Sequence, residues 1–206
     1  MPEAFIAEID ERIKSITGSI HDLQPSDFLI PTEHKNALVV SESDSFVDVA
    51  VCIRRDLLER LAGKAFPRDF DLEILPDLSI VVEELSHFNR YCDHAMRNRP
   101  LSALELELQA EVDKFAFALQ CLDERNENHL REQIFSVMFD ECKLGDWVTD
   151  EEIHRYQKAH DVARAFCRSV LDQSKAGPGE RLLFQEFFAS TYEDRLSIRG
   201  QARMIY

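Results

Sequence analysis

The sequence predicts an α+β fold that is predominantly α, with one β-hairpin and six to seven packed helices. Apolar residues recur at helical spacing through most of the chain, but between residues 37 and 53 the pattern changes to β-rich segments. The six glycines and seven prolines fall mainly between these segments, where they end helices and form turns. A chain of 206 residues can bury a core of its own, so residues 1–206 are expected to form a single domain.

The N-terminal segment predicts a helix over residues 2–16, because its large apolar residues recur at helical spacing and Gly18 follows them. The polar stretch 21–36 contains Pro25 and Pro31 and is expected to be a loop. Segments 37–40 and 46–53 are rich in β-branched residues and are separated by a short polar stretch, so they predict the hairpin.

The remainder of the chain is expected to be helical almost throughout. Ser102 with Glu105, and Thr149 with Glu152, have the spacing of capping boxes that begin helices. The helices expected after the hairpin cover 54–62, 77–97, 102–121, 127–141, 149–174 and a last segment from residue 180. The hairpin and the first long helix pair thus occupy about 37–122, and a helical C-terminal portion occupies about 125–206. Residues 98–101 leave room only for a tight connection, so the two long helices are expected to pack antiparallel, with Phe88 among the residues that face the second helix.

Charge and composition limit the classes of function. A net charge of −15 opposes binding to nucleic acid or to an anionic membrane. No apolar run approaches the roughly 18 residues of a membrane span, and no basic-then-apolar leader opens the chain. The five cysteines are widely spaced without a C-x-x-C pair, which predicts free thiols in a reducing compartment. We therefore expect a cytoplasmic protein without nucleic-acid or membrane partners.

The most informative stretch is Glu83-Glu84-Leu85-Ser86-His87, followed by Glu107 on the next expected helix. Residues four apart on a helix lie on the same face, so Glu83 and His87 could hold one ion. The stretch resembles the H-E-x-x-H helix of gluzincin-type zinc peptidases, with Glu83 in place of the first histidine, over roughly residues 37–122. The resemblance implies that Glu84 is the catalytic base and that His87 and Glu107 bind a divalent metal such as zinc. Either Glu83 or Glu111 is the candidate for the remaining ligand.

The departure from the peptidase pattern leaves a second interpretation open. A site with Glu83 in place of a histidine is harder and more anionic than a peptidase zinc site. On the expected helix, Glu83 and His87 lie with Arg90 and His94 almost opposite the apolar stripe, which is equally typical of a solvated face. Glu111 differs, because it lies at the edge of an apolar face, where a carboxylate needs a partner such as Lys114, His87 or an ion.

Two further patterns bear on function. Arg155 and His160 have the R-x4-H spacing of HEPN ribonucleases, in which arginine stabilises phosphate charge and histidine transfers protons. The last helix has a broad apolar face that includes Phe184, Phe187, Phe188 and Tyr192. The tail 195–206 has no acidic residue and carries three arginines: Arg195, Arg199 and Arg203. An apolar patch with a charged rim predicts a homodimer or a stable protein partner. The alternative is that the basic stripe covers the acidic body of the same chain.

Three functions follow from these patterns. The first is a protein-interaction module with a degenerate metallopeptidase-like core, which is a binding protein and not an enzyme. The second is a metal-dependent hydrolase that uses the Glu/His site, and the third is a HEPN-like ribonuclease. Only the hydrolase requires a bound ion, so no cofactor is certain from the sequence, and a divalent metal such as zinc is the candidate.

Overall fold

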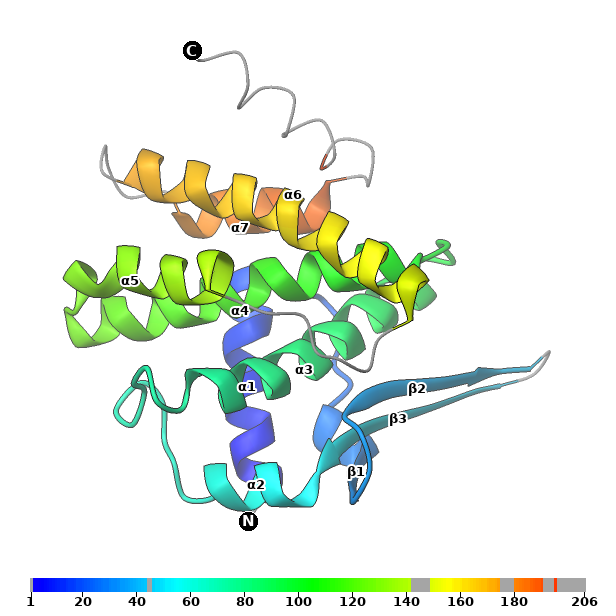
Figure 1. The fold of residues 1–206 in the computed structure, drawn as a ribbon. Helices are drawn as coiled ribbons and strands as arrows, with labels where there is room; N and C mark the ends of the chain where they lie inside the picture. Colours follow the sequence, from blue (N-terminus) through cyan, green and yellow to red (C-terminus); the bar gives the residue numbers. More distant parts are fainter. Residues whose placement is uncertain (1, 44–45, 142–148, 175–179, 191–194, 196–206) are drawn as a thin grey trace.

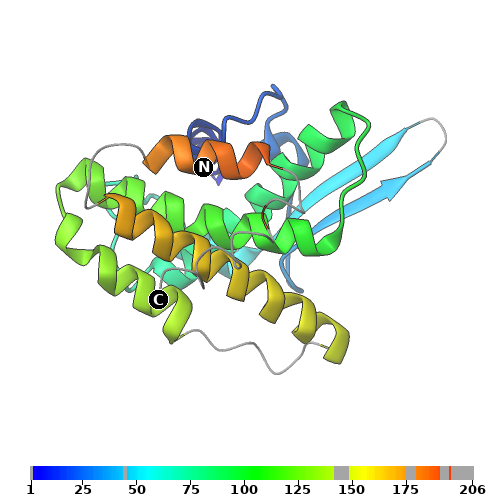
Figure 2. The ribbon, with the colours of Figure 1, turned by 90° about the horizontal axis from the view of Figure 1, so that it is seen from above.

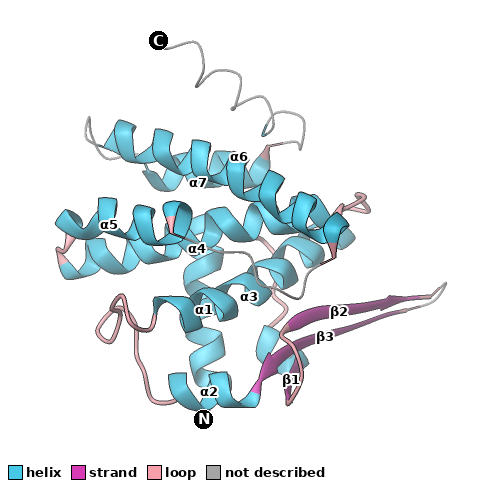
Figure 3. Cartoon of the chain, viewed as in Figure 1, coloured by secondary structure: helices cyan, strands magenta, loops and turns pink. Residues whose placement is uncertain are grey.

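The computed structural model describes residues 2–43, 46–141, 149–174, 180–190 and 195 (Figure 1). These residues form seven α-helices and one small three-stranded sheet, so the predicted α+β, predominantly α class is confirmed (Figure 3). None of the described helices is both long enough and apolar enough to cross a membrane.

The sheet has the strand order β1-β3-β2 and comprises β1 (Leu29–Thr32), β2 (Ala37–Glu42) and β3 (Val47–Arg54). Strand β2 pairs antiparallel with β3, which confirms the hairpin. Strand β1 runs parallel to β3 and lies in the stretch that was expected to be a loop. Pro31 is tolerated because β1 is an edge strand, where half of the amide groups need no partner in the ladder. The far end of the hairpin projects from the helical body (Figures 1 and 2).

The helices lie close to their expected positions: α1 (Pro2–Thr17), α2 (Arg55–Leu61), α3 (Leu75–Met96), α4 (Ala103–Arg125), α5 (Arg131–Phe135), α6 (Asp150–Ser174) and α7 (Glu180–Ala189). Short 3-10 turns cover Pro25–Phe28 and Asn128–Leu130, and a π-helical turn, Ser136–Asp140, continues α5. Both capping boxes are confirmed, since Ser102 and Glu105, and Thr149 and Glu152, exchange side-chain and backbone hydrogen bonds.

Helix α3 begins two residues before the expected cap at Asp77. Pro76 fits within the first turn, where no intrahelical amide bond is lost. The Asp71 carboxylate accepts hydrogen bonds from the backbone amides of Glu73 and Ile74 just before the helix. Asp77 is therefore not needed as a cap, and its carboxylate binds the guanidinium of Arg60.

A tight connection joins α3 to α4. Asn98 takes the left-handed conformation with a φ of 49°, and the Arg99 amide donates a hydrogen bond to the His94 carbonyl at 3.0 Å. This is the Schellman pattern, in which a left-handed residue reverses the chain at a helix end. The contacts Ser86–Asp113 and His87–Glu107 then run in opposite directions along the two helices. The predicted antiparallel pair is thus confirmed.

The side of α3 that meets α4 is polar, and it is buried. The side chains expected to be solvated are nearly closed off from solvent, with His87 8%, Arg90 4% and His94 9% exposed. Phe88 was expected to face α4, but its ring packs against the rings of His21 and Phe28. The prediction of a solvated face is wrong because α4 and the segments beside it supply polar partners for that side of the helix.

Helix α4 is at the centre of the molecule, where it packs against α3, α6, α1, α5 and α7 (Figure 1). One apolar core includes residues from α1 through α7. Phe115 of α4 is fully buried, and its ring lies 5.9 Å from the ring of Phe135 and 5.6 Å from that of Phe139. The polar residues of α4 are consequently held between α3 and α6, where the candidate site lies.

Candidate metal site between α3 and α4

A groove with a volume of about 1720 Å³ opens between the hairpin, α3, the start of α4 and the start of α6. The hairpin contributes Leu38, Val40 and Glu42, and α6 contributes Glu152 and Tyr156. The α3 and α4 side of the groove carries most of the residues predicted from the sequence, namely Glu83, Glu84, His87 and Glu107. The groove therefore brings the predicted site together with a space that can hold a ligand.

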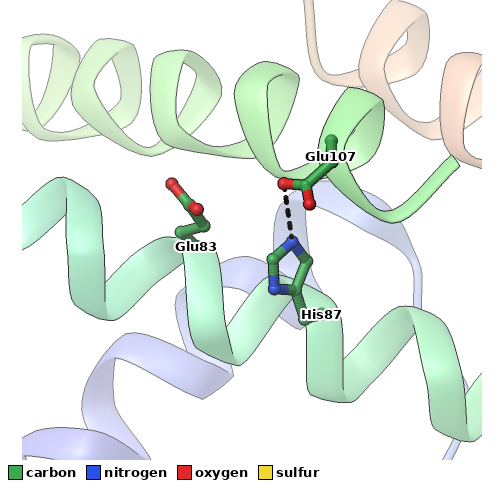
Figure 4. Close-up of side chains that lie close together, drawn as sticks. All are labelled: Glu83, His87 and Glu107. Atoms are coloured by element: carbon green, nitrogen blue, oxygen red, sulfur yellow. Dashed lines mark ion pairs between the residues drawn. The ribbon is translucent and has the colours of Figure 1, made fainter. Parts of the chain in front are cut away.

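Glu83, His87 and Glu107 form a group that could hold a metal ion (Figure 4). One ligand atom from each of the three lies within 4.8 Å of the others. Glu83 and His87 project from successive turns of α3, and Glu107 reaches them from α4 (Figure 4). These are the i, i+4 and next-helix positions that the sequence predicted. The group found in the described part of the chain includes Glu83 and not Glu111, the alternative candidate for the remaining ligand.

Each ring nitrogen of His87 faces a carboxylate but lies too far from it for a hydrogen bond. Nδ1 lies 3.5 Å from Glu84 Oε2, and Nε2 lies 3.6 Å from Glu107 Oε2. Both distances exceed the roughly 2.7–3.2 Å of an N–H···O hydrogen bond. Buried atoms of this kind are normally bonded, yet His87 Nε2 and Glu84 Oε2 have no hydrogen-bond partner.

The spacing of Nε2 and Glu107 fits an ion between them. Ligand atoms about 2.0–2.2 Å from a tetrahedral zinc ion lie about 3.4 Å from each other. The 3.6 Å between His87 Nε2 and Glu107 Oε2 is close to that value. His87 and Glu107 are thus already placed as two neighbouring ligands of one ion.

The electrostatics of the site also favour a cation. Burial lowers the pKa of His87, but the carboxylates of Glu107 and Glu84 outweigh it and raise the pKa to about 10. Burial raises the pKa of Glu84, and the neighbouring His87 opposes that effect. A positive charge is therefore stabilised between these carboxylates, either as a proton on the ring or as a metal ion that takes its place.

Glu84 lies against the ring nitrogen of His87 that is remote from Glu107. In metal sites a carboxylate at this place accepts the N–H of the coordinating histidine, which fixes the ring and its tautomer. The contact suits a residue that orients His87. The role of general base, which the zincin resemblance implies for Glu84, stays a prediction.

Replacement of Glu84 by glutamine should weaken zinc binding by about 10–100-fold, the usual effect of losing such an orienting carboxylate. The measurement is calorimetric titration of metal-free protein with zinc. Glu59→Gln on α2 is the matched control, because Glu59 is exposed and does not line the groove. An unchanged affinity in Glu84→Gln would show that His87 needs no help from Glu84.

Glu111 belongs to a neighbouring network. Its Oε1 lies 2.6 Å from Lys114 Nζ, and its Oε2 lies 3.3 Å from His160 Nδ1. Its side chain is only 17% exposed, which confirms the expectation of a mostly buried carboxylate paired with Lys114. Lys114 also binds Glu83, with 2.8 Å between Nζ and Oε2. Lys114 is thus shared between the metal-site residue Glu83 and Glu111.

Sequence reasoning did not place α6 beside the metal group. Arg155 Nε lies 3.6 Å from Glu107 Oε1, and Tyr156 lines the groove. Burial, followed by the charge of Glu107, raises the pKa of Tyr156, so its hydroxyl stays protonated. In the ribonuclease prediction Arg155 and His160 would bind a phosphate. Here Arg155 faces Glu107 and His160 faces Glu111, and these two carboxylates would repel a phosphate group. The α4–α6 contact joins distant parts of the chain, and no local pattern could have shown it.

The C-terminal residues differ from their prediction. Phe184, Phe187 and Phe188 are buried in this chain's own structure, so they are not available as a patch for a partner. Arg195, expected in an exposed basic stripe, is also fully buried; it donates a hydrogen bond to the Phe188 carbonyl and lies over the Phe187 ring. Three other residues of that prediction lie outside the described residues: Tyr192, Arg199 and Arg203. A homodimer or other protein partner stays a prediction, without support from these buried groups.

Comparisons with protein-family models, with curated proteins and with solved structures found no match to this chain. The resemblance of residues 37–122 to zincins therefore stays a prediction.

Proposed function

We propose that this protein binds one divalent metal ion, for which zinc is the best fit, through Glu83, His87 and Glu107. We further propose that the ion acts on a ligand in the groove, as in a metal-dependent hydrolase. The observation that carries the proposal is the buried His87 Nε2, which lacks a hydrogen-bond partner and lies 3.6 Å from Glu107. A divalent ion there would supply Lewis acidity toward a carbonyl or phosphoryl oxygen.

The number and surroundings of the ligands support this function. Three protein ligands are typical of catalytic zinc sites, whereas structural sites have four and are closed. All three residues line the groove, so a ligand held in the groove would have access to the ion. Arg155 lies beside Glu107 and holds that carboxylate in place. Tyr156, kept protonated, can donate a hydrogen bond to an oxygen of the ligand on which negative charge develops.

The carboxylate-rich composition bears on the choice of metal. One imidazole and two carboxylates suit zinc, but each carboxylate also makes the site more favourable for manganese. We therefore expect zinc to bind more tightly than manganese, in keeping with the general order of affinities for first-row divalent ions. Magnesium, which usually keeps several of its waters, should bind most weakly of the three.

A second candidate is the interaction module, and the hairpin supports it. Phe46 and Val47 lie where β3 begins and its pairing with β2 ends, with 62% and 48% of their surface exposed. Large apolar side chains grouped at one exposed place are typical of partner surfaces. Val47 also lines the groove, so a partner docked on this end would contact the groove that contains the proposed metal site.

The test separates metal binding from hydrolysis. Metal-free protein is titrated with zinc in a calorimeter, and a peptide and ester library is then incubated with the zinc-loaded protein, with and without chelator. We expect one zinc per chain, near-complete loss of binding in Glu107→Gln, and hydrolysis that the chelator removes. Binding without hydrolysis of any substrate would favour the interaction module, and absence of binding would overturn the metal site.

A further inference from the structure

Two cations in the described part of the chain lie against proposed ligands: Arg155 is 3.6 Å from Glu107, whereas Lys114 donates a hydrogen bond to Glu83. The Lys114 ammonium group lies 2.8 Å from Glu83 Oε2 and 2.6 Å from Glu111 Oε1, and its side chain is only 11% exposed. Glu111 in turn contacts His160 of α6. Lys114, its two glutamate partners and His160 form a partly buried chain of charged and polar groups across α3, α4 and α6.

The three proposed ligands are not equally prepared for an ion. His87 and Glu107 face each other at 3.6 Å, and a carboxylate oxygen of Glu83 lies within 4.8 Å of the ligand atoms of both. Among the three, Glu83 alone is bonded to a lysine in the described structure. Glu83 is therefore the ligand that an ion must share with Lys114 or take from it.

We infer that Lys114 acts as an internal cation that competes with the metal ion for Glu83 and so sets the metal affinity of the site. The inference rests on the proposed metal site and adds its regulation. Hydrogen bonds to charged groups contribute more than neutral ones, so loss or weakening of the Lys114–Glu83 bond carries a cost for metal binding. An ion bound to Glu83 would also lie close to the ammonium group, which repels it.

Glu111 determines how strongly Lys114 competes. While Glu111 shares the ammonium group, part of the lysine charge is neutralised away from Glu83. Without the Glu111 charge, Lys114 would bind Glu83 more strongly. Removal of Lys114 and removal of the Glu111 charge should consequently change metal affinity in opposite directions, although each breaks the same buried ion pair.

The experiment measures zinc affinity by calorimetry for the wild type, Lys114→Met and Glu111→Gln, with folding checked by circular dichroism. We expect Lys114→Met to bind zinc about tenfold or more tightly, and Glu111→Gln to bind it about tenfold or more weakly. Lys64→Met on the loop after α2 and Glu59→Gln on α2 are the charge-matched controls, and neither residue lines the groove. Glu83→Gln lacks one proposed ligand and should itself bind zinc more weakly. Relative to that weaker affinity, the effect of each variant should be largely lost, because Lys114 acts through Glu83.

The outcomes distinguish this inference from the metal site. Zinc binding by the wild type, with both variants weaker or both unchanged, would overturn the role of Lys114 and leave the metal site standing. If the Lys114 and Glu111 variants change zinc affinity by the same factors in the Glu83→Gln background, their charges act directly on the ion and not through Glu83, which would also overturn the role of Lys114. If Lys114→Met does not fold, the zinc affinity of Glu111→Gln is compared with that of the wild type and with that of the double variant Glu83→Gln/Glu111→Gln. Weaker binding that is largely lost in the double variant would support the inference, and any other result would overturn it. Absence of zinc binding in every folded protein would overturn the metal site together with the inference.

Discussion

Replacement of Glu111 by alanine should lower the free energy of unfolding by about 3–5 kcal/mol, the usual cost of removing one partner of a buried ion pair. Glu111 contacts both Lys114 and His160, and its loss leaves the largely buried Lys114 with Glu83 alone. Urea denaturation at pH 7 measures the change.

The lowered pKa of Glu111 also predicts how the free energy of unfolding depends on pH. Burial alone would raise the pKa of Glu111, but Lys114 and His160 lower it to about 2, from 4.5 as the ordinary value. A depressed carboxyl pKa contributes stability that is complete above the unfolded pKa and is lost as the pH falls through the folded one. At about 1.36 kcal/mol per pH unit, the contribution is about 3 kcal/mol, and it should disappear between pH 4.5 and pH 2.

Glu11→Ala is the control for this prediction, because Glu11 is an exposed residue of α1. Its replacement should change the free energy of unfolding by no more than about 0.5 kcal/mol. The stability difference between wild type and Glu111→Ala should also shrink below pH 4.5. A Glu111→Ala protein as stable as the control, or a difference independent of pH, would mean that the Lys114 contact contributes nothing.

Replacement of Phe115 by alanine should destabilise the protein by about 3–5 kcal/mol, because the lost ring leaves a cavity in a close-packed core. Phe115 is fully buried beside Phe135 and Phe139. It lies one turn from Glu111, so its packing also helps to hold α4 in the position that presents the site residues.

Urea denaturation again measures the change, and Phe46→Ala is the matched control, since Phe46 is 62% exposed at the end of the hairpin. The control should lose less than about 0.5 kcal/mol. If the two phenylalanine variants lost similar small amounts, Phe115 would not be part of a tightly packed centre.

Local patterns were sufficient for much of the fold. The capping boxes of Ser102 and Thr149 predicted where α4 and α6 begin, because a cap depends only on residues three positions apart. Strand β1 was missed because Pro31 is unfavourable in a strand unless the strand lies at an edge. Edge position depends on how the sheet assembles, and the local sequence does not contain that information.

The local sequence also predicted only part of the candidate site. The i, i+4 spacing of Glu83 and His87 predicted that both would project from one side of a helix, and the next-helix position of Glu107 predicted the third residue. The burial of this polar face was not predictable, because periodicity separates apolar from polar residues but cannot show that another helix will cover the polar side. For the same reason the sharing of Lys114 and the approach of Arg155 required the structure.

The proposed metal ion would be held by Glu83, His87 and Glu107. The most direct test is an anomalous difference map, measured at the zinc absorption edge, from crystals of the protein grown with zinc. We expect one strong peak between His87 Nε2 and Glu107, at about 2.0–2.2 Å from each ligand atom, with Glu83 turned toward it. Crystals grown with zinc that show no peak at this place, with His87 still between Glu84 and Glu107, would contradict the claim.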